Sequence, residues 1–243
     1  MIYKLMTYNI QHGLDYKARL SGQRQVNFQG LKDVIDIVKP DILNVNEIYG
    51  SGIDCNSKEY FDQVSYIANI CSFPYAFFSK AINAKNGEYG NAIFSKIPFL
   101  GKEIVHITDP CPNLESKLLY ESRVITKFDF GTFDLITTHI GLNDEEKENA
   151  YVSLMNIINP NKKTILLGDF NMNIDNRLIQ KILNKYKEVT IEAKEKVINT
   201  YPSITPYSKI DYIFVSKEIE IIDADVIDCT NSDHLPLYAI ISL

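Results

Sequence analysis

The feature that most limits the fold is a long series of short strand-like segments with only a few helical stretches between them. Runs such as YAFFS, GNAIFS, GKEIVHI, SRVITKFDF and TFDLITTHI are rich in β-branched and aromatic residues. Among them, FDFGTFD is typical of a hairpin that turns at Gly131. Many strands interleaved with a few helices favour sheets packed face to face, with helices outside. The sequence therefore predicts an α/β fold of this kind.

Four segments have apolar residues near the spacing of a helix. They are residues 25–38, 57–70, 143–158 and 175–187. Ser57 is the predicted cap of the second. In the third, Asn143 and Glu146 form a capping-box pattern, and the acidic first turn suits the helix dipole better than it suits a metal site.

The composition is that of a globular protein, with 45% hydrophobic and 23% charged residues among 243. No break in composition divides the chain, so we predict a single domain over residues 1–243. The longest apolar runs fall far short of the ~20 residues of a membrane span, and we predict no secretory leader. Four scattered cysteines without metal-site spacing are expected to be buried free thiols, namely Cys55, Cys71, Cys111 and Cys229. The expected location is therefore cytoplasmic.

The net charge of −6 lowers the expectation of a nuclease, because proteins that hold duplex DNA through its phosphates are more often basic. Lys181, Lys185 and Lys187 are predicted to lie on the fourth helix, so a local basic groove stays open as an alternative. An acidic surface binds divalent metal ions readily.

Polar residues collect where the predicted strands begin or end. The segment TILLGDFNMNID is one example, because a buried strand runs directly into Asp169 and Asn171. The others are Asn9, Glu47, His139, Asp211, Asp233 and His234. Each alone has an ordinary interpretation as a turn residue, a cap or a core histidine. Together they predict one cluster, since layered α/β folds mount functional groups at one edge of their strands.

This inventory suits metal-assisted phosphoryl transfer. Mg²⁺ prefers hard oxygen ligands and keeps several waters, which Glu47 and Asn9 would satisfy. A carboxylate such as Asp169 can align and activate water, while histidine and amide side chains donate to the phosphoryl oxygens. A carboxylate such as Asp211 would keep an imidazole protonated. The motifs of acyl hydrolases, of common nucleotide-binding loops and of zinc sites do not occur in the sequence.

The chain resembles the endonuclease/exonuclease/phosphatase superfamily over nearly its whole length. The segments that carry the resemblance are TYNIQHG, PDILNVNE, YGNAIFSKIPF, ESRVITKFD, TTHIG, LLGDFNMN, KIDYIFVS and SDHLPL, in the order typical of that family. The resemblance implies a DNase I-like fold, which is a four-layered α/β sandwich of two packed mixed β-sheets flanked by helices. It also implies that the active site lies at one edge of the sandwich.

The resemblance assigns a role to each residue. Glu47 matches the metal-binding glutamate of the family, with Asn9 and Asp233 near the Mg²⁺, for which Mn²⁺ is a candidate substitute. Asp169 matches the aspartate that orients or deprotonates the attacking water, and Asn171 matches an amide that contacts the scissile phosphate.

The remaining matches concern the substrate phosphate. His234 matches the essential histidine and Asp211 its orienting partner, while His139 falls where many members have a phosphate-contacting histidine. Arg123 is a further candidate for the phosphate, and a salt bridge to Glu121 is its alternative role.

The substrate stays open among three hypotheses. The first is a phosphodiesterase, or a phosphomonoesterase, that acts on a modest-sized or lipid-like phosphoester. The chain has no tryptophan, which abasic-site enzymes of the family use as a wedge, and this absence favours the first hypothesis over a nuclease. The second is an endo- or exonuclease acting on DNA or RNA. The third is a non-catalytic binding module that kept the fold, which the full set of site residues disfavours. No obligate protein partner is evident.

Overall fold

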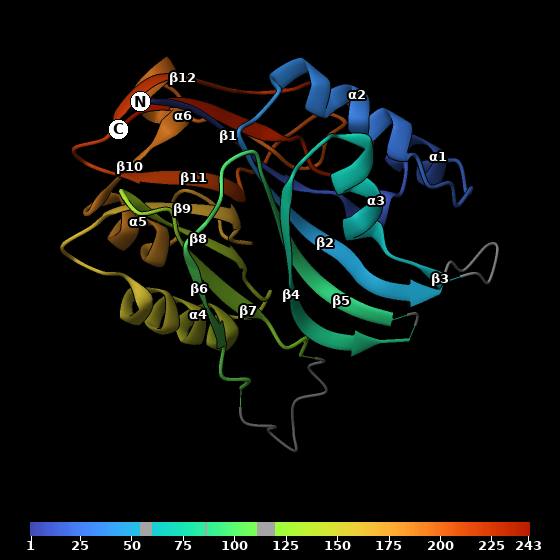
Figure 1. Ribbon diagram of the computed structural model, residues 1–243, viewed down its shortest axis with the longest axis horizontal. Coiled ribbons are helices and arrows are strands. Elements are labelled where there is room, and N and C mark those ends of the chain that lie inside the picture. The colour runs from blue at the N-terminus through green and yellow to red at the C-terminus, as the bar shows by residue number, and fades with distance from the viewer. Residues whose placement is uncertain (54–59, 86, 111–119) are drawn as a thin grey trace.

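Two β-sheets lie face to face in the computed structural model of the chain (Figure 1). The structure describes residues 1–53, 60–85, 87–110 and 120–243. In this part of the chain the first sheet has the order β12 (Glu220–Val226), β13 (Leu237–Ser242), β1 (Ile2–Asn9), β2 (Ile42–Ile53), β5 (Gly87–Ser95) and β4 (Tyr75–Ala84), with β3 (Tyr60–Phe61) paired to β2. The second has the order β10 (Tyr186–Glu188), β11 (Asp211–Ser216), β9 (Lys163–Asp169), β8 (Phe133–His139), β7 (Val124–Asp129) and β6 (Gly101–His106).

Both sheets are mixed. The pairs β1–β2 and β8–β9 are parallel, and the other neighbours are antiparallel. Consecutive antiparallel strands β7 and β8 form the predicted hairpin, and Gly131 turns it with a φ of 80°.

Helices cover the outer face of each sheet (Figure 1). On the first sheet these are α2 (Phe28–Val38) and α3 (Gln63–Ile70), and on the second α4 (Asp144–Ile157) and α5 (Arg177–Leu183). The short helices are η1 (Gln11–Gly13), α1 (Tyr16–Leu20) and α6 (Val189–Lys194). The four-layered sandwich with two mixed sheets is therefore confirmed.

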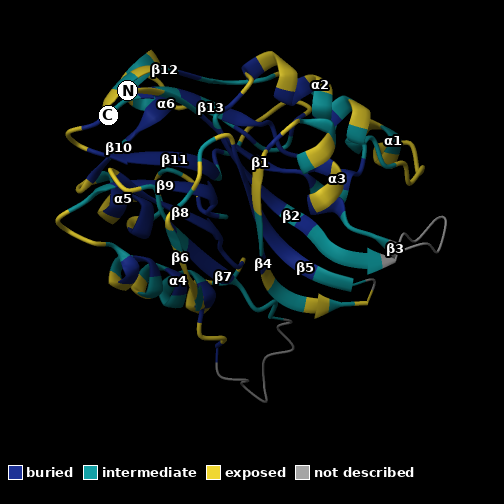
Figure 2. Cartoon of the chain, in the orientation of Figure 1, coloured by how far each residue is buried: buried dark blue, intermediate teal, exposed yellow. Residues whose placement is uncertain are grey.

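Strand β9 shows how the layers are built, because its side chains alternate between two cores. Ile165 and Leu167 pack in the core between the sheets, whereas Leu166 packs against α4 and α5. All three are fully buried, as expected for strands covered on both faces. Figure 2 shows the central strands as buried and the outer faces of the helices as exposed.

Two helix predictions need correction. The fourth helix is shorter than expected, because Tyr186 and Glu188 are buried in β10, which pairs with β11. Lys185 and Lys187 therefore do not share a helix with Lys181.

The second helical segment begins later than predicted. Asp62 caps α3 by accepting a hydrogen bond from the backbone N–H of Ser65, and the predicted cap, Ser57, lies outside the described residues. The capping box of Asn143 and Glu146 on α4 is confirmed.

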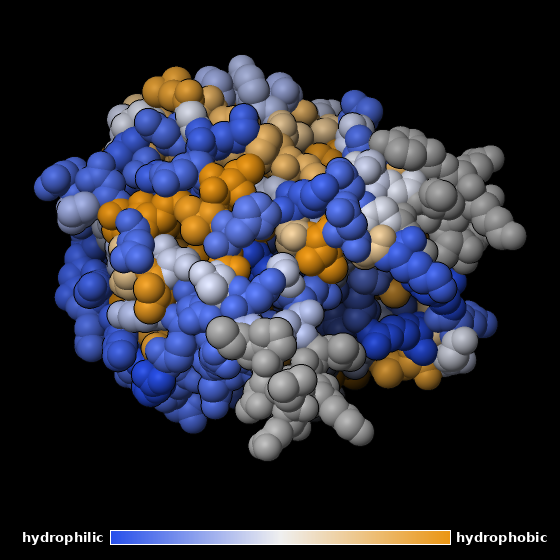
Figure 3. All heavy atoms as spheres, turned by 90° about the horizontal axis from the view of Figure 1, so that it is seen from below, coloured by the Kyte–Doolittle hydropathy of each residue, from blue (hydrophilic) through white to orange (hydrophobic). Residues whose placement is uncertain are grey.

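The described surface is largely hydrophilic, and the two described cysteines are free thiols. Hydrophilic side chains cover much of the face in Figure 3, interrupted by hydrophobic groups. Among the described residues, no helix is both long and apolar enough to cross a bilayer. Cys71 and Cys229 are free and partly buried, whereas Cys55 and Cys111 lie outside the described residues.

Candidate active site

Two rows of polar side chains meet at one edge of the sandwich, one row from each sheet. In the second sheet, His139 at the end of β8 lies opposite Asp169, and Asp169 lies opposite Asp211 at the start of β11. In the first sheet, Asn9 at the end of β1 lies opposite Asn46 of β2. Strand register thus brings together residues that are far apart in the sequence, as the strand-end pattern predicts.

Amide groups join the two rows. The Asn9 side-chain N–H donates to Asp169 Oδ2 at 3.0 Å, and Asn46 Oδ1 accepts from the Asp169 backbone N–H at 3.2 Å. The Asn46 amide nitrogen donates in turn to Asn91 Oδ1 and to the Thr138 carbonyl. All five residues are buried. The carboxylate of Asp169 is therefore held rigidly between the sheets.

Gly168 allows β9 to approach β8 closely, directly before Asp169. Its φ is 144°, and a Cβ at this position would lie 2.0 Å from the Thr138 carbonyl oxygen. We expect Gly168→Ala to lower the free energy of unfolding by about 3 kcal/mol or more, because the clash is with backbone in a packed layer. Chemical denaturation measures this, with Gly131→Ala as the control. That position also has positive φ, but a Cβ there would lie 3.5 Å from its nearest neighbour, a side-chain atom of Leu100. Equal losses in both variants would contradict the role assigned to Gly168.

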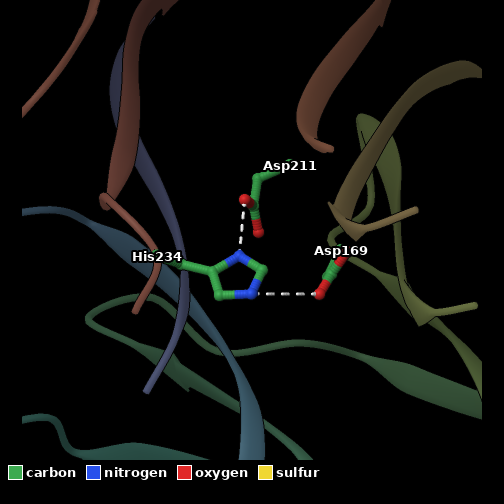
Figure 4. Close-up of side chains that lie close together, drawn as sticks. All are labelled: Asp169, Asp211 and His234. Carbon is green, nitrogen blue, oxygen red and sulfur yellow. Dashed lines mark hydrogen bonds and ion pairs between the residues drawn. The ribbon is translucent and has the colours of Figure 1, made fainter. Parts of the chain in front are cut away.

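His234 lies between two carboxylates, as Figure 4 shows. Its Nδ1 is 2.9 Å from Asp211 Oδ2, and its Nε2 is 3.8 Å from Asp169 Oδ2. Burial lowers the pKa of His234, but the charges of Asp211 and Asp169 outweigh this effect and raise the pKa to about 10. The imidazole is therefore an imidazolium at neutral pH, and its Nε2–H points toward Asp169.

His139 also lies beside Asp169 and is a neutral imidazole that donates through its Nε2–H. Arg123 donates to His139 Nδ1 at 2.9 Å, with Nε2 farther away at 3.5 Å. Because a guanidinium cannot accept a hydrogen bond, Nδ1 is the acceptor and Nε2 carries the proton. Burial, followed by the charges of Arg123 and His234, holds the pKa of His139 well below its usual value. Arg123 also forms a salt bridge to Glu121, at 2.9 Å, which is the alternative role that the sequence leaves open for it.

Three side-chain N–H groups therefore lie around Oδ2 of Asp169. Asn9 Nδ2 is within hydrogen-bond distance of Oδ2, whereas His139 Nε2 lies 3.5 Å and His234 Nε2 3.8 Å away. The two histidine distances are too long for good hydrogen bonds, so both protons remain available to another acceptor. Burial and the charge of Asp211 raise the pKa of Asp169 to about 7, which is suitable for a general base near neutral pH.

Asn171 reaches the site by a turn and not by strand alternation. Strand β9 ends at Asp169, and Asn171 has a φ of 50°. Its backbone N–H donates to Asp169 Oδ1 at 2.9 Å, and its side-chain amide donates to the Ile140 carbonyl at 2.8 Å. Because β9 ends before Asn171, strand alternation does not set the direction of its side chain, whereas Phe170 is fully buried in the core.

Glu47 projects from a β-bulge. The pairing of β2 with β5 shifts between Asn46 and Ile48, and Glu47 has a φ of 59°. The strand was expected to end here, but it continues to Ile53, and the bulge re-aims the side chain. Glu47 Oε1 accepts from Asn9 Nδ2 at 3.0 Å, and the Tyr89 hydroxyl forms a further hydrogen bond with the carboxylate.

Asp233 lies near Glu47, and residues that follow β1 hold its side chain. Its Oδ2 accepts from the Gln11 side-chain amide at 2.8 Å and lies 3.6 Å from the Arg19 guanidinium. The Gln11 backbone N–H donates to Asn9 Oδ1 at 3.1 Å, which links Asp233 to Asn9. Burial raises the pKa of Asp233.

Two sets of side chains could hold a metal ion. Asp169, Asp211 and His234 offer ligand atoms within 4.8 Å of one another, and within this cluster His234 Nδ1 lies 2.9 Å from Asp211 Oδ2. Glu47, by contrast, projects from its bulge beside Asn9 and lines a cavity of about 440 Å³. Glu47, Asp233 and the side-chain oxygen of Asn9 offer oxygen ligands, the kind that Mg²⁺ prefers.

Sequence reasoning missed several residues of the site, among them Asn46, Gln11 and Tyr89. For Asn46 a signal was present, because in LNVNE the residues Asn44 and Asn46 are two positions apart and so share one face of the strand. For Gln11 and Tyr89 the sequence carries no signal, since their roles depend on contacts across the fold.

Comparison with solved structures shows many with the same fold. Examples are an endonuclease/exonuclease/phosphatase of Beutenbergia cavernae (18% identity, TM-score 0.81, covering 100% of this chain and 72% of the other), a mannosyl-6-phosphatase of Bacteroides thetaiotaomicron (14%, 0.74, 99% and 100%) and the catalytic domain of human Nocturnin with bound sulfate (17%, 0.68, 99% and 93%). No curated protein matches significantly in sequence.

The sequence profile of one family matches residues 6–234, which include every residue of the site described above. Members of this family are generally hydrolases that act on phosphoesters. The chain belongs to the Endonuclease/Exonuclease/phosphatase family.

Proposed function

We propose that the chain is a divalent-metal-dependent phosphoesterase, in which Asp169 activates the water that attacks phosphorus in line. The observation that carries this proposal is the arrangement of Asn9, His139 and His234 around Asp169. The Asp169 carboxylate can accept a proton there, and the two histidine N–H groups beside it are too far away to be occupied by hydrogen bonds to that carboxylate.

Each residue has a defined part in this scheme. Asp169 accepts the proton of the attacking water, and its pKa of about 7 makes it a competent base at neutral pH. The Nε2–H groups of His139 and His234 donate to the phosphoryl oxygens, whose negative charge grows as the bond to water forms. Asp211 keeps His234 protonated, and Arg123 fixes the tautomer of His139.

The amide of Asn171 has a second N–H besides the one that it donates to Ile140, and this proton is the proposed contact to the phosphate. Mg²⁺ held by Glu47, Asp233 and Asn9, or Mn²⁺ in its place, would neutralise charge on the phosphoryl and leaving oxygens. Without the Asn171 contact or without the metal ion, the phosphate would be less polarised when Asp169 activates the water.

A substrate panel, assayed with Mg²⁺ and with a chelator, tests the proposal. It contains an aryl phosphomonoester, an aryl phosphodiester, a lipid phosphodiester, single-stranded DNA, an abasic duplex and RNA. We expect chelator-sensitive hydrolysis of at least one small or lipid phosphoester. Cleavage of nucleic acid alone would make the protein a nuclease, and no hydrolysis of any substrate would favour a non-catalytic binding module.

A further inference from the structure

The cavity beside Glu47 carries positive charge close to the proposed reaction centre. Arg19 and Arg24 line it, and Glu47 is the one acidic side chain among its described lining residues. In a chain of net charge −6, two guanidinium groups in one cavity favour an anionic occupant.

The two arginines differ in their partners. Arg19 lies 3.6 Å from Asp233, so part of its charge is compensated. Arg24 forms no ion pair with any described residue, and its guanidinium offers a fork of N–H donors that matches phosphate or carboxylate. Arg24 is therefore the group available to bind an incoming anion.

Two further polar atoms in the cavity wall have unused hydrogen-bonding capacity. Gln11 Oε1 and His12 Nδ1 are buried and have no hydrogen-bond partner among the described residues. Buried polar atoms of this kind are rare and call for an explanation. Because the Gln11 nitrogen donates to Asp233, this part of the cavity wall is tied to the proposed metal site.

The backbone of this segment is held in a strained conformation. Gln11, His12 and Gly13 have successive φ values of 45°, 49° and 82°, and the first two are unfavourable for residues with a side chain. The Gln63 side chain fixes the turn by donating to the His12 carbonyl at 3.0 Å. Strain of this kind persists at ligand-binding segments, where the surrounding structure over-determines the backbone.

We propose that this cavity binds a second anionic group of a small phosphoester substrate, with Arg24 as the residue that recognises it. The inference rests on the proposed function, because Glu47 lines the cavity and belongs to the proposed metal site. A volume of about 440 Å³ is in the range of small-ligand sites. The reacting phosphate binds at Asp169 and the histidines, while the second anion, a phosphate or a carboxylate, binds at Arg24.

Matched sugar phosphates test this specificity. Fructose 1,6-bisphosphate is compared with fructose 6-phosphate, and 6-phosphogluconate with glucose 6-phosphate, so that the pairs separate a phosphate from a carboxylate as the second anion. We expect kcat/KM of the wild type to favour the doubly anionic member of at least one pair by about tenfold or more, as one charged hydrogen bond contributes. In Arg24→Gln that ratio falls close to one.

Lys17→Gln is the matched control, because it removes the same charge from the exposed surface of α1 outside the cavity lining. We expect it to leave both ratios unchanged. An equal loss of the ratio in Lys17→Gln and Arg24→Gln would show a general charge effect and overturn the assignment of Arg24. No preference in either pair for the wild type would overturn the proposal.

A binding measurement separates this proposal from the proposed function. In the Asp169→Asn protein, calorimetry gives the Kd of each sugar phosphate without turnover, with and without Arg24→Gln. A preference for the doubly anionic ligand that depends on Arg24, in a protein whose wild type hydrolyses nothing, would support the cavity and contradict the phosphoesterase. Equal Kd values within both pairs would overturn the cavity assignment even if aryl phosphates are hydrolysed.

Discussion

Asp169→Asn is expected to lower kcat by about 10³-fold or more, since a general base contributes about 10²-fold to 10⁴-fold and this base also orients the water. The amide is isosteric and cannot accept a proton, and its one oxygen keeps only one of the two hydrogen bonds that Asp169 accepts, from Asn9 and from the Asn171 backbone. Turnover of whichever substrate the panel identifies measures the effect. The control is Asp144→Asn, the same chemical change at a fully exposed position of α4, which should leave kcat unchanged.

Removal of the buried charge in the same variant is expected to offset the loss of one hydrogen bond, so that its Tm stays close to that of the wild type. Burial and Asp211 raise the pKa of Asp169 from its ordinary 3.8 to about 7, so the folded state binds this proton more tightly than the unfolded state does. Stability therefore falls as pH rises between these values, and asparagine removes that penalty. An inactive variant whose Tm is much lower than that of the wild type would point to a structural role and contradict the assignment as a base.

The second large effect concerns the buried ion pair of Lys209 and Glu188. The Lys209 ammonium lies 3.1 Å from Glu188 Oε1, and both side chains are almost completely buried, at 1% and 0% exposure. Glu188 also caps α6 by accepting from the backbone N–H groups of Thr190 and Ile191. We expect Lys209→Met to lower the free energy of unfolding by about 3–5 kcal/mol, because it leaves a buried carboxylate without its counter-charge.

The double variant Glu188→Gln with Lys209→Met is the matched test. It removes both charges, while the remaining amide oxygen still accepts from the α6 backbone, so we expect it to recover most of the loss. Denaturant titration of the wild type, both single variants and the double variant gives the coupling free energy of the pair. Additive losses would show that the pair contributes little, contrary to this account.

The parts of the site that the sequence predicts are those fixed by regular strand geometry. His139, Asp169 and Asp211 stand at strand boundaries, and parallel or antiparallel register then places them side by side. The hairpin at Gly131 and the capping box on α4 depend on short-range patterns, and both are confirmed.

The parts that the sequence does not predict arise from irregular backbone or from pairing. Glu47 was placed at a strand end, but it projects from a bulge within a continuing strand, and nothing in the local pattern marks that bulge. Asn171 reaches Asp169 through a turn with positive φ, which strand alternation does not describe. The helical spacing predicts too long a fourth helix, because the pairing of β10 with β11 outweighs that spacing in the segment. The helices α1 and α6 are too short for a periodic signal.

The central claim is that a divalent cation at Glu47 supports hydrolysis at Asp169, and the dependence of turnover on Mg²⁺ concentration tests it most directly. Wild type, Glu47→Gln and the exposed control Glu192→Gln are compared on one substrate. We predict that Glu47→Gln needs more than about tenfold higher Mg²⁺ for half-maximal turnover, since even loss of an outer-shell partner costs about 10-fold to 100-fold in metal affinity. The control should match the wild type. Turnover that is unaffected by chelator, or identical Mg²⁺ curves for Glu47→Gln and wild type, would contradict the account.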